Sequence, residues 1–245
     1  MKDCIVIIPT YNEKENIGNI IPYTLNLSDR LEILIIEDGS PDGTADIVKG
    51  LMAQYPGRIH IIERSGKLGL GTAYITGFKW ALENNYQYIF EMDADFSHPP
   101  EKLLELLDAC ENKGAYMSVG SRYVKNGGVV NWPFNRLFLS LFASKYVRLV
   151  TGMRIKDTTA GFVCYRNETL KRIDFDKIKF VGYAFQIEMK FAVWLSEVKV
   201  IEVPIIFKDR EAGTSKMNGS IIKEAMLGVL QMKLQAFKNK QNYVA

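Results

Sequence analysis

Short apolar runs alternate with amphipathic segments through the first half of the chain. The apolar runs predict β-strands at Cys4–Ile8, Glu32–Ile36, Arg58–Ile62, Tyr88–Met92 and Tyr116–Val119. The intervening segments predict helices over Glu13–Leu25, Thr44–Tyr55, Gly71–Asn84 and Pro100–Asn112. This alternation is typical of an α/β fold with a mostly parallel central sheet and helices on both faces. Ligands bind such sheets at the carboxyl ends of the strands.

The second half of the chain is less regular. It predicts an amphipathic helix over about residues 131–150, a strand over Gly161–Tyr165, a helix over Tyr183–Leu195, a strand over Lys199–Phe207 and a last amphipathic helix over about residues 220–238. No repeat or linker divides the chain, so we expect one catalytic domain over residues 1–245. No signal peptide and no apolar run of membrane-spanning length is present, so any membrane contact is expected to be peripheral.

The two long helices of the second half carry apolar stripes. The stripe of the first consists of Phe134, Leu137, Phe138, Leu141, Phe142, Tyr146 and Leu149, with Lys145 and Arg148 beside it. The last helix has Ile222, Met226, Val229 and Phe237 among lysines. Such faces either cover the core of a sheet or lie in a membrane interface, and the pattern leaves both interpretations open.

Charge and cysteine usage narrow the class of partner. The net charge is only +3, but the segment from Lys208 to the C-terminus holds seven basic and three acidic residues. A basic segment indicates an anionic partner such as a phosphate or a membrane surface, although a solvated helix face has the same composition. The three cysteines have no metal-binding spacing, which is typical of reduced thiols in a cytosolic protein.

The acidic pair Asp93-Ala94-Asp95 follows the fourth predicted strand. Residues two apart on an extended chain point the same way, so both carboxylates can hold one divalent cation such as Mg²⁺ or Mn²⁺. Such an ion neutralises a departing diphosphate. The alternative is a loop pair that caps the next helix. The position of Asp93 and Asp95 directly after a strand favours the metal-binding interpretation.

Two more strands end in polar motifs. Residues 9–13 offer Tyr11 for stacking on a base, and residues 37–43 offer Asp38 to a base or ribose. Each motif alone is also an ordinary cap or turn. A dinucleotide-binding protein needs a Gly-rich turn after the first strand, and a nucleotidyltransferase needs a Gly-rich, Arg-containing loop there. The sequence has neither, and a nucleotide-sugar sensor without activity remains the non-enzymatic alternative.

Eight stretches between residues 5 and 217 resemble family 2 glycosyltransferases of the glycosyltransferase-A fold, and among these the dolichol-phosphate (polyprenol-phosphate) mannose synthases. The stretches are IPTYNEKENI, EDGSPDGTADIV, GLGTAYITGF, MDADFSHPPE, GSRYV, DTTAGFVCYR, GYAFQIEM and REAGTSKM. The resemblance implies inverting transfer of mannose from GDP-mannose to a polyprenyl monophosphate at the cytoplasmic face of a membrane. The alternative is glucose or an amino sugar from a UDP-sugar. The implied partners are the nucleotide sugar, the lipid, and a membrane surface or membrane subunit, with no nucleic acid.

The resemblance also implies residue roles. Nucleoside binding falls to Pro9, Tyr11, Glu13 and Asp38. The donor diphosphate is expected to be bound by Asp93, Ala94 and Asp95, and a loop with Arg210 and Lys216 is expected to close over the donor. The metal is held by Asp93 and Asp95, with Ser97 in the position of a third ligand where the family often has Gln.

The acceptor side is implied in the same way. Arg122 is expected between the donor and acceptor phosphates, and is catalytic together with Asp95. The acceptor phosphate is expected to contact Arg122, Arg136 and Ser140; the last two lie four residues apart and share one helix face. A phosphate monoester is mostly dianionic at pH 7, so it needs no protein base. Asp157 and Glu188 are expected to orient sugar hydroxyls.

Overall fold

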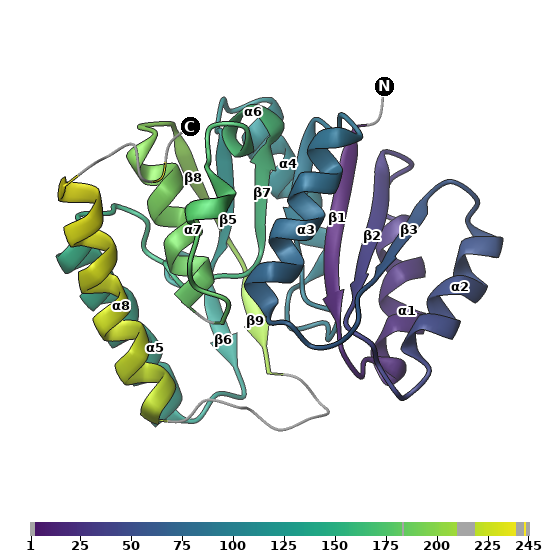
Figure 1. Cartoon of the computed structure of the whole chain (residues 1–245), viewed down its shortest axis with the longest axis horizontal. Coiled ribbons are helices and arrows are strands. Elements are labelled where there is room, and N and C mark those ends of the chain that lie inside the picture. Colours follow the sequence, from purple (N-terminus) through teal and green to yellow (C-terminus); the bar gives the residue numbers. More distant parts are fainter. Residues whose placement is uncertain (1–2, 183, 210–218, 239–242, 244–245) are drawn as a thin grey trace.

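A seven-stranded sheet organises the chain in the computed structural model, which describes residues 3–182, 184–209, 219–238 and 243 (Figure 1). In spatial order the strands are β3 (Ile59–Glu63), β2 (Leu31–Glu37), β1 (Cys4–Thr10), β4 (Tyr88–Glu91), β7 (Val163–Arg166), β5 (Met117–Ser121) and β8 (Val200–Pro204). All neighbours are parallel except β7, which runs antiparallel to both β4 and β5. The expected mostly parallel α/β fold is therefore confirmed, with one reversed strand near its centre.

Helices cover both faces of this sheet because its strands are apolar on both sides. In β1, Cys4, Val6 and Ile8 pack toward one core cluster, whereas Ile5 and Ile7 pack toward the other. The first cluster is covered by α1 (Lys14–Leu25), α2 (Thr44–Gln54) and α4 (Leu103–Glu111), which follows the 3₁₀ turn η1 (Pro100–Lys102). The second is covered by α3 (Leu70–Glu83) and α7 (Ala184–Leu195), with the short α6 (Asn167–Leu170) and η2 (Phe175–Lys177) beside them.

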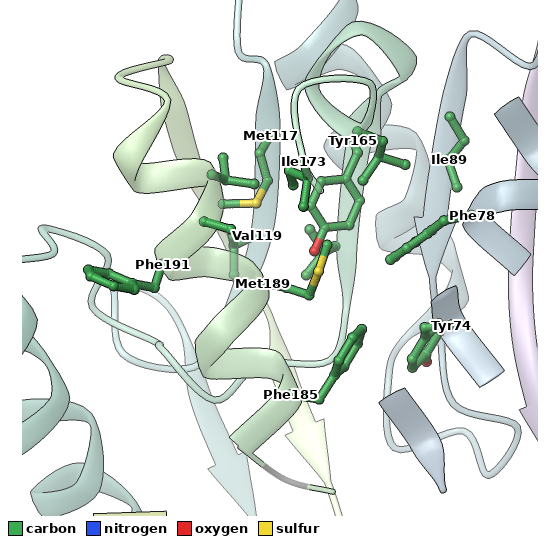
Figure 2. Close-up of a cluster of buried hydrophobic side chains, with 14 of the residues drawn as sticks. Tyr74, Phe78, Ile89, Met117, Val119, Tyr165, Ile173, Phe185, Met189 and Phe191 are labelled. Atoms are coloured by element: carbon green, nitrogen blue, oxygen red, sulfur yellow. The ribbon is translucent and has the colours of Figure 1, made fainter. Parts of the chain in front are cut away.

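Aromatic stacking joins α3 to α7 over the second core cluster. Figure 2 shows Tyr74 and Phe78 of α3 facing Phe185 and Met189 of α7. The Tyr74 and Phe185 rings are parallel, with centroids 6.0 Å apart. This packing holds α7 against the sheet beside β4.

A smaller unit extends from the carboxyl ends of the parallel strands past the β8 edge of the sheet (Figure 1). It contains the parallel pair β6 (Gly128–Val130) and β9 (Ile206–Lys208), and the helices α5 (Phe134–Thr151) and α8 (Gly219–Lys238). Figure 1 shows α5 and α8 side by side at one end of the molecule. The Tyr146 hydroxyl of α5 donates to the Met226 carbonyl of α8 at 3.0 Å. None of the helices in the described ranges is long and apolar enough to cross a membrane.

Two boundary predictions were wrong, and proline explains both. The segment Lys199–Phe207 is two strands, because Pro204 has no N–H for the ladder and ends β8. The helix predicted from about residue 131 begins at Phe134, because Pro133 disfavours helical backbone at Trp132. The strand β6 was missed, since three residues are too few to show a period.

Candidate active site

The acidic turn after β4 is held by hydrogen bonds between its own backbone N–H groups and side chains. The Asp93 N–H donates to His98 Nδ1 at 3.2 Å, and the Ser97 N–H donates to Asp95 Oδ1 at 3.0 Å. Burial lowers the pKa of His98 to about 4, so the ring is neutral and its Nδ1 can accept. His98 thus holds the turn that presents the two aspartates, a role that sequence reasoning missed.

The chemistry of this turn fits a divalent ion that is also bound by substrate. Among the described residues, no group of three or more His, Cys, Asp or Glu side chains has the geometry to hold a metal. A Mg²⁺-type ion commonly takes one or two carboxylates and completes its shell with waters and substrate phosphates. Asp93 and Asp95 fit that pattern. For Ser97, the contact that the structure shows is the backbone N–H on Asp95, and its service as a metal ligand stays a prediction.

The residues expected to hold the nucleoside lie at neighbouring strand ends. Pro9 is in β1 and pairs with Ile36 of β2, and the Asp38 N–H donates to the Thr10 carbonyl at 3.0 Å. The Glu13 N–H donates to Thr44 Oγ1 at 3.0 Å. The β1 and β2 ends are thereby locked together, which brings the four predicted nucleoside residues to one edge of the sheet.

Arg64 is an unpredicted component of this edge. Its guanidinium donates to Asp38 through Nε at 2.6 Å to Oδ1 and through Nη2 at 2.8 Å to Oδ2, and both side chains are mostly buried. The Lys67 ammonium lies 4.6 Å from the centroid of the Tyr11 ring. The Asp38 carboxylate is therefore oriented by Arg64 before any ligand arrives.

Arg122 follows β5 and is anchored by a buried carboxylate. Its Nε and Nη2 donate to Asp157 at 2.7 and 2.6 Å, its backbone N–H donates to the same carboxylate at 2.9 Å, and Nη2 also donates to Thr159 Oγ1 at 2.8 Å. Burial alone would raise the pKa of Asp157, but the charge and hydrogen bonds of Arg122 outweigh it and hold that pKa below its usual value. The expectation that Asp157 orients sugar hydroxyls is wrong, because its carboxylate is fully buried and each of its oxygens accepts two hydrogen bonds from Arg122 or Thr159.

Arg136 and Ser140 lie on α5, as the spacing predicted. Arg136 Nη1 donates to Asp209 Oδ2 at 2.5 Å, and its guanidinium carbon lies 4.2 Å from the Trp132 ring centroid. The Tyr123 hydroxyl donates to Ser140 Oγ at 2.6 Å. Both side chains are positioned by neighbours on other elements.

One cavity of about 240 Å³ connects these groups. Its polar lining includes Asp93, His98, Arg122, Arg136, Ser140 and Gln186. Its apolar lining includes Leu139, Phe142, Tyr146 and Val147 of α5 with Met226 and Val229 of α8. The cavity therefore runs from the acidic turn, past two arginines, to the gap between the two long helices. The nucleoside residues lie outside it, and Arg210 and Lys216 lie outside the described residues.

A buried polar network lies beneath the cavity and was not predicted. Gln186 Nε2 donates to Glu91 at 2.5 Å, and Lys190 Nζ donates to Gln186 Oε1 at 3.1 Å. All three side chains are buried. Burial raises the pKa of Glu91 and lowers that of Lys190, while the opposite charge of each group limits the shift of the other. Charged residues inside the apolar run of β4 and inside the buried α7 were the signal that sequence reasoning overlooked.

Glu188, the other residue expected to orient sugar hydroxyls, has a structural contact instead. Its Oε2 accepts the backbone N–H groups of Lys179 and Phe180 at 2.8 and 2.9 Å. It is buried on α7 and does not line the cavity. That expectation is therefore wrong.

Comparison with known proteins gives a family and named relatives. The sequence model described as glycosyl transferase family 2 matches residues 5–178. The chain is 46% identical over 227 residues to polyprenol monophosphomannose synthase of Mycolicibacterium smegmatis, covering 93% of this chain and 85% of the relative. It is 42% identical over 232 residues to undecaprenyl-phosphate mannosyltransferase of Micrococcus luteus, covering 95% and 94%.

Similar folds occur among solved structures. Glucosyl-3-phosphoglycerate synthase of Mycobacterium tuberculosis, in a complex with Mn²⁺, uridine diphosphate and glucosyl-3-phosphoglycerate, superposes with a TM-score of 0.66 at 14% identity. The match covers 96% of this chain and 79% of that one. At this identity the likeness supports the fold alone.

Proposed function

The chain belongs to glycosyl transferase family 2, and on that premise we propose that it moves mannose from GDP-mannose onto the phosphate of a polyprenyl phosphate. The names of two relatives above 40% identity support a polyprenyl-type acceptor and a mannosyl donor. We also propose that residues 1–245 act as one catalytic domain at the cytoplasmic face of a membrane. The three cysteines, all buried and free, are compatible with a reducing compartment.

The observation that carries this proposal is the composition of the cavity described above. It places Asp93, a predicted diphosphate and metal ligand, in the same space as Arg122, Arg136 and Ser140. Beyond these polar groups it is lined by apolar side chains of α5 and α8. Such a lining can accommodate a diphosphate, a second phosphate and an isoprenoid chain.

The proposed reaction is a single displacement at the anomeric carbon. An oxygen of the acceptor phosphate forms the new C–O bond, and the C–O bond to the diphosphate breaks, so GDP leaves with the electron pair. The acceptor's second pKa is near 6, so no protein base is required. Arg122 and Arg136 offset the repulsion between two anionic reactants. A divalent ion held by Asp93 and Asp95 would stabilise charge on the departing diphosphate, and either Mg²⁺ or Mn²⁺ suits two carboxylates.

The donor and acceptor are tested by one panel. Purified protein is incubated with labelled GDP-mannose, UDP-glucose or UDP-N-acetylglucosamine, each with a polyprenyl phosphate and Mg²⁺ or Mn²⁺. We expect organic-extractable label from GDP-mannose with either metal and none after EDTA. Label from a UDP-sugar instead would replace the proposed donor, and no lipid product from any donor would overturn the proposed activity.

We further propose that the exposed apolar face of α5 and α8 contacts the membrane that holds the acceptor. Most of the stripe on α5 is solvent-exposed, with Phe138 59% and Phe142 52% accessible, and within the described residues only its Tyr146 packs against a core cluster. Leu227, Leu230 and Leu234 of α8 are exposed as well. Lys145 and Arg148 beside the α5 stripe suit anionic headgroups.

Vesicle flotation tests the membrane contact. The double change Phe138→Asp with Phe142→Asp should abolish binding to vesicles of anionic phospholipid. Leu104→Asp is the matched control, because Leu104 is exposed on the remote helix α4. Equal flotation of all three proteins would contradict the contact.

A further inference from the structure

Gln186 bridges two buried charges at the base of the cavity. Its Nε2 donates to Glu91 at 2.5 Å, and its Oε1 accepts from the Lys190 ammonium at 3.1 Å. Lys190 is held in turn by the Ala160 and Gln186 carbonyls, and Glu91 accepts the Tyr165 hydroxyl at 3.1 Å. The amide is thus clamped between an acceptor and a donor.

This clamp fixes which way the amide faces. A flipped amide would set Oε1 against the Glu91 carboxylate and Nε2 against the Lys190 ammonium, losing two hydrogen bonds between buried groups. Leaving buried polar groups unpaired costs more than an ordinary hydrogen bond contributes. The amide plane of Gln186 is therefore preorganised without any ligand.

One hydrogen of this amide remains for a ligand. Nε2 carries two hydrogens, and among the described residues only Glu91 accepts one of them. Gln186 lines the same cavity as Asp93, and Gly161 is close to its amide group. A Cβ at position 161 would lie 3.6 Å from Gln186 Nε2. Because Gly161 has no side chain, this approach to the amide nitrogen stays open to a ligand in the cavity.

A neutral donor in this position suits a hydroxyl better than a phosphate. The two arginines that line the cavity supply positive charge for phosphates, whereas the Gln186 amide is uncharged and lies between the oppositely charged Glu91 and Lys190. A sugar hydroxyl is an uncharged acceptor and needs no positive charge from its donor. Sites that hydrogen-bond a hydroxyl discriminate strongly against analogues that lack it.

We propose that Gln186 binds the donor sugar, donating its second amide hydrogen to one hydroxyl of the hexose beside the acidic turn, with Glu91 and Lys190 as the residues that position it. The assignment deepens the proposed function and rests on it. It makes Gln186 a determinant of which sugar is accepted, separate from the groups that bind the nucleoside and the phosphates.

Calorimetric titration of GDP and GDP-mannose in the presence of Mn²⁺ tests this assignment. In Gln186→Leu, we expect the affinity for GDP-mannose to fall about 3- to 10-fold, the range for one neutral hydrogen bond, while the affinity for GDP stays unchanged. Retained GDP binding also shows that the variant is folded. Equal affinity of wild type and Gln186→Leu for GDP-mannose would overturn the proposal.

Deoxy analogues of the donor sharpen the result without depending on a variant's folding. One monodeoxy GDP-mannose should bind wild-type protein more weakly than GDP-mannose, and that difference should vanish in Gln186→Leu. If every deoxy analogue bound wild type as well as GDP-mannose does, the proposal would fail.

A second variant addresses access and a third addresses positioning. Gly161→Ala makes only ordinary contacts of 3.6–3.9 Å and should fold, yet its methyl group covers the amide nitrogen and should reduce GDP-mannose binding selectively. Lys190→Met removes the donor to Gln186 Oε1, so the amide can rotate and the affinity for GDP-mannose should also fall. Glu91→Gln keeps an acceptor for Gln186 Nε2, so this variant should bind GDP-mannose as tightly as wild type. Unchanged GDP-mannose binding in Gly161→Ala and Lys190→Met would count against the clamp. Failure of the wild type to bind GDP-mannose at all refutes the proposed donor instead, and the same comparison then uses UDP-glucose and UDP.

Discussion

The proposed donor and acceptor sides of the site are built in different ways. On the proposed donor side, the predicted binding residues lie at or shortly after the carboxyl ends of the parallel strands β1, β2 and β4, so the sheet itself brings them to one edge. On the acceptor side, Arg122 and Arg136 are held by carboxylates far away in sequence, Asp157 and Asp209. The positions of the proposed donor-binding residues therefore depend on the topology of the sheet. The positions of the proposed acceptor-binding arginines depend on ion pairs with residues far away in sequence.

The two acceptor-side ion pairs also differ from each other. Asp157 is fully buried, and the Arg122 side chain is only 9% exposed. The Arg136–Asp209 pair is about one quarter exposed on both sides. A buried pair is costly to break because it leaves an unpaired charge, whereas a pair in contact with water is not. We expect Arg122 to be required for stability as well as chemistry, and Arg136 mainly for binding.

The largest effect is expected for Asp157→Asn. Removing this charge leaves Arg122 buried without its counter-ion, which should lower the free energy of unfolding by about 3–5 kcal/mol. Urea denaturation measures it. The control is Asp108→Asn, because Asp108 pairs with Lys113 on the surface and should leave stability almost unchanged. Similar midpoints for both variants would show that the buried pair is not structural.

Asp95→Ala tests the donor side. Asp95 accepts the Ser97 N–H within the acidic turn but belongs to neither core cluster, so we expect only a small fall in the thermal midpoint. We expect a loss of kcat of about 10²–10³-fold, the size seen when one preorganised electrostatic group is removed. Asp46→Ala on the exposed first turn of α2 is the matched control. Turnover with a normal metal requirement in Asp95→Ala would refute the assignment.

Arg136→Gln should separate binding from stability on the acceptor side. Loss of one charged contact to the lipid phosphate should raise the acceptor KM about 10- to 100-fold with little change in the donor KM. Lys145→Gln controls for general attraction to anionic lipid, since Lys145 is exposed on the same helix and does not line the cavity. Equal effects of the two substitutions would mean that Arg136 acts only as a surface charge.

The smallest effect is a pH dependence of stability from the buried pair. The pKa of Asp157 is lower in the folded protein than its unfolded value near 3.9. Its contribution is therefore present above about pH 4 and is lost as the pH falls through the lower folded pKa. The stability difference between wild type and Asp157→Asn should narrow below about pH 4. A difference that stays constant down to pH 2 would contradict the shift.

The donor side was readable from the sequence because its signals are local. Each of β1, β2 and β4 is an apolar run, and the polar motifs follow these runs directly, so one rule about strand ends placed Tyr11, Asp38 and Asp93 together. The reversed strand β7 was not readable, since an apolar run does not state its direction. The three-residue strands β6 and β9 were too short to show a period.

The acceptor side and the base of the cavity were harder to predict. Arg122 and Asp157 are 35 residues apart, and no local pattern reports such a contact. The apolar segments that form β4 and α7 predict buried core, although they contain Glu91, Gln186 and Lys190. The useful clue there was charge inside buried elements, because a buried charge requires a partner.

The most direct test of the account is a crystal structure with Mn²⁺ and GDP, in which the anomalous signal of manganese locates the metal. We expect the ion on Asp93 and Asp95 with diphosphate oxygens completing its shell, the guanosine along the ends of β1 and β2, and the cavity toward Arg122 still open for a second phosphate. Bound GDP with the metal elsewhere, or with both carboxylates turned away from the diphosphate, would contradict it.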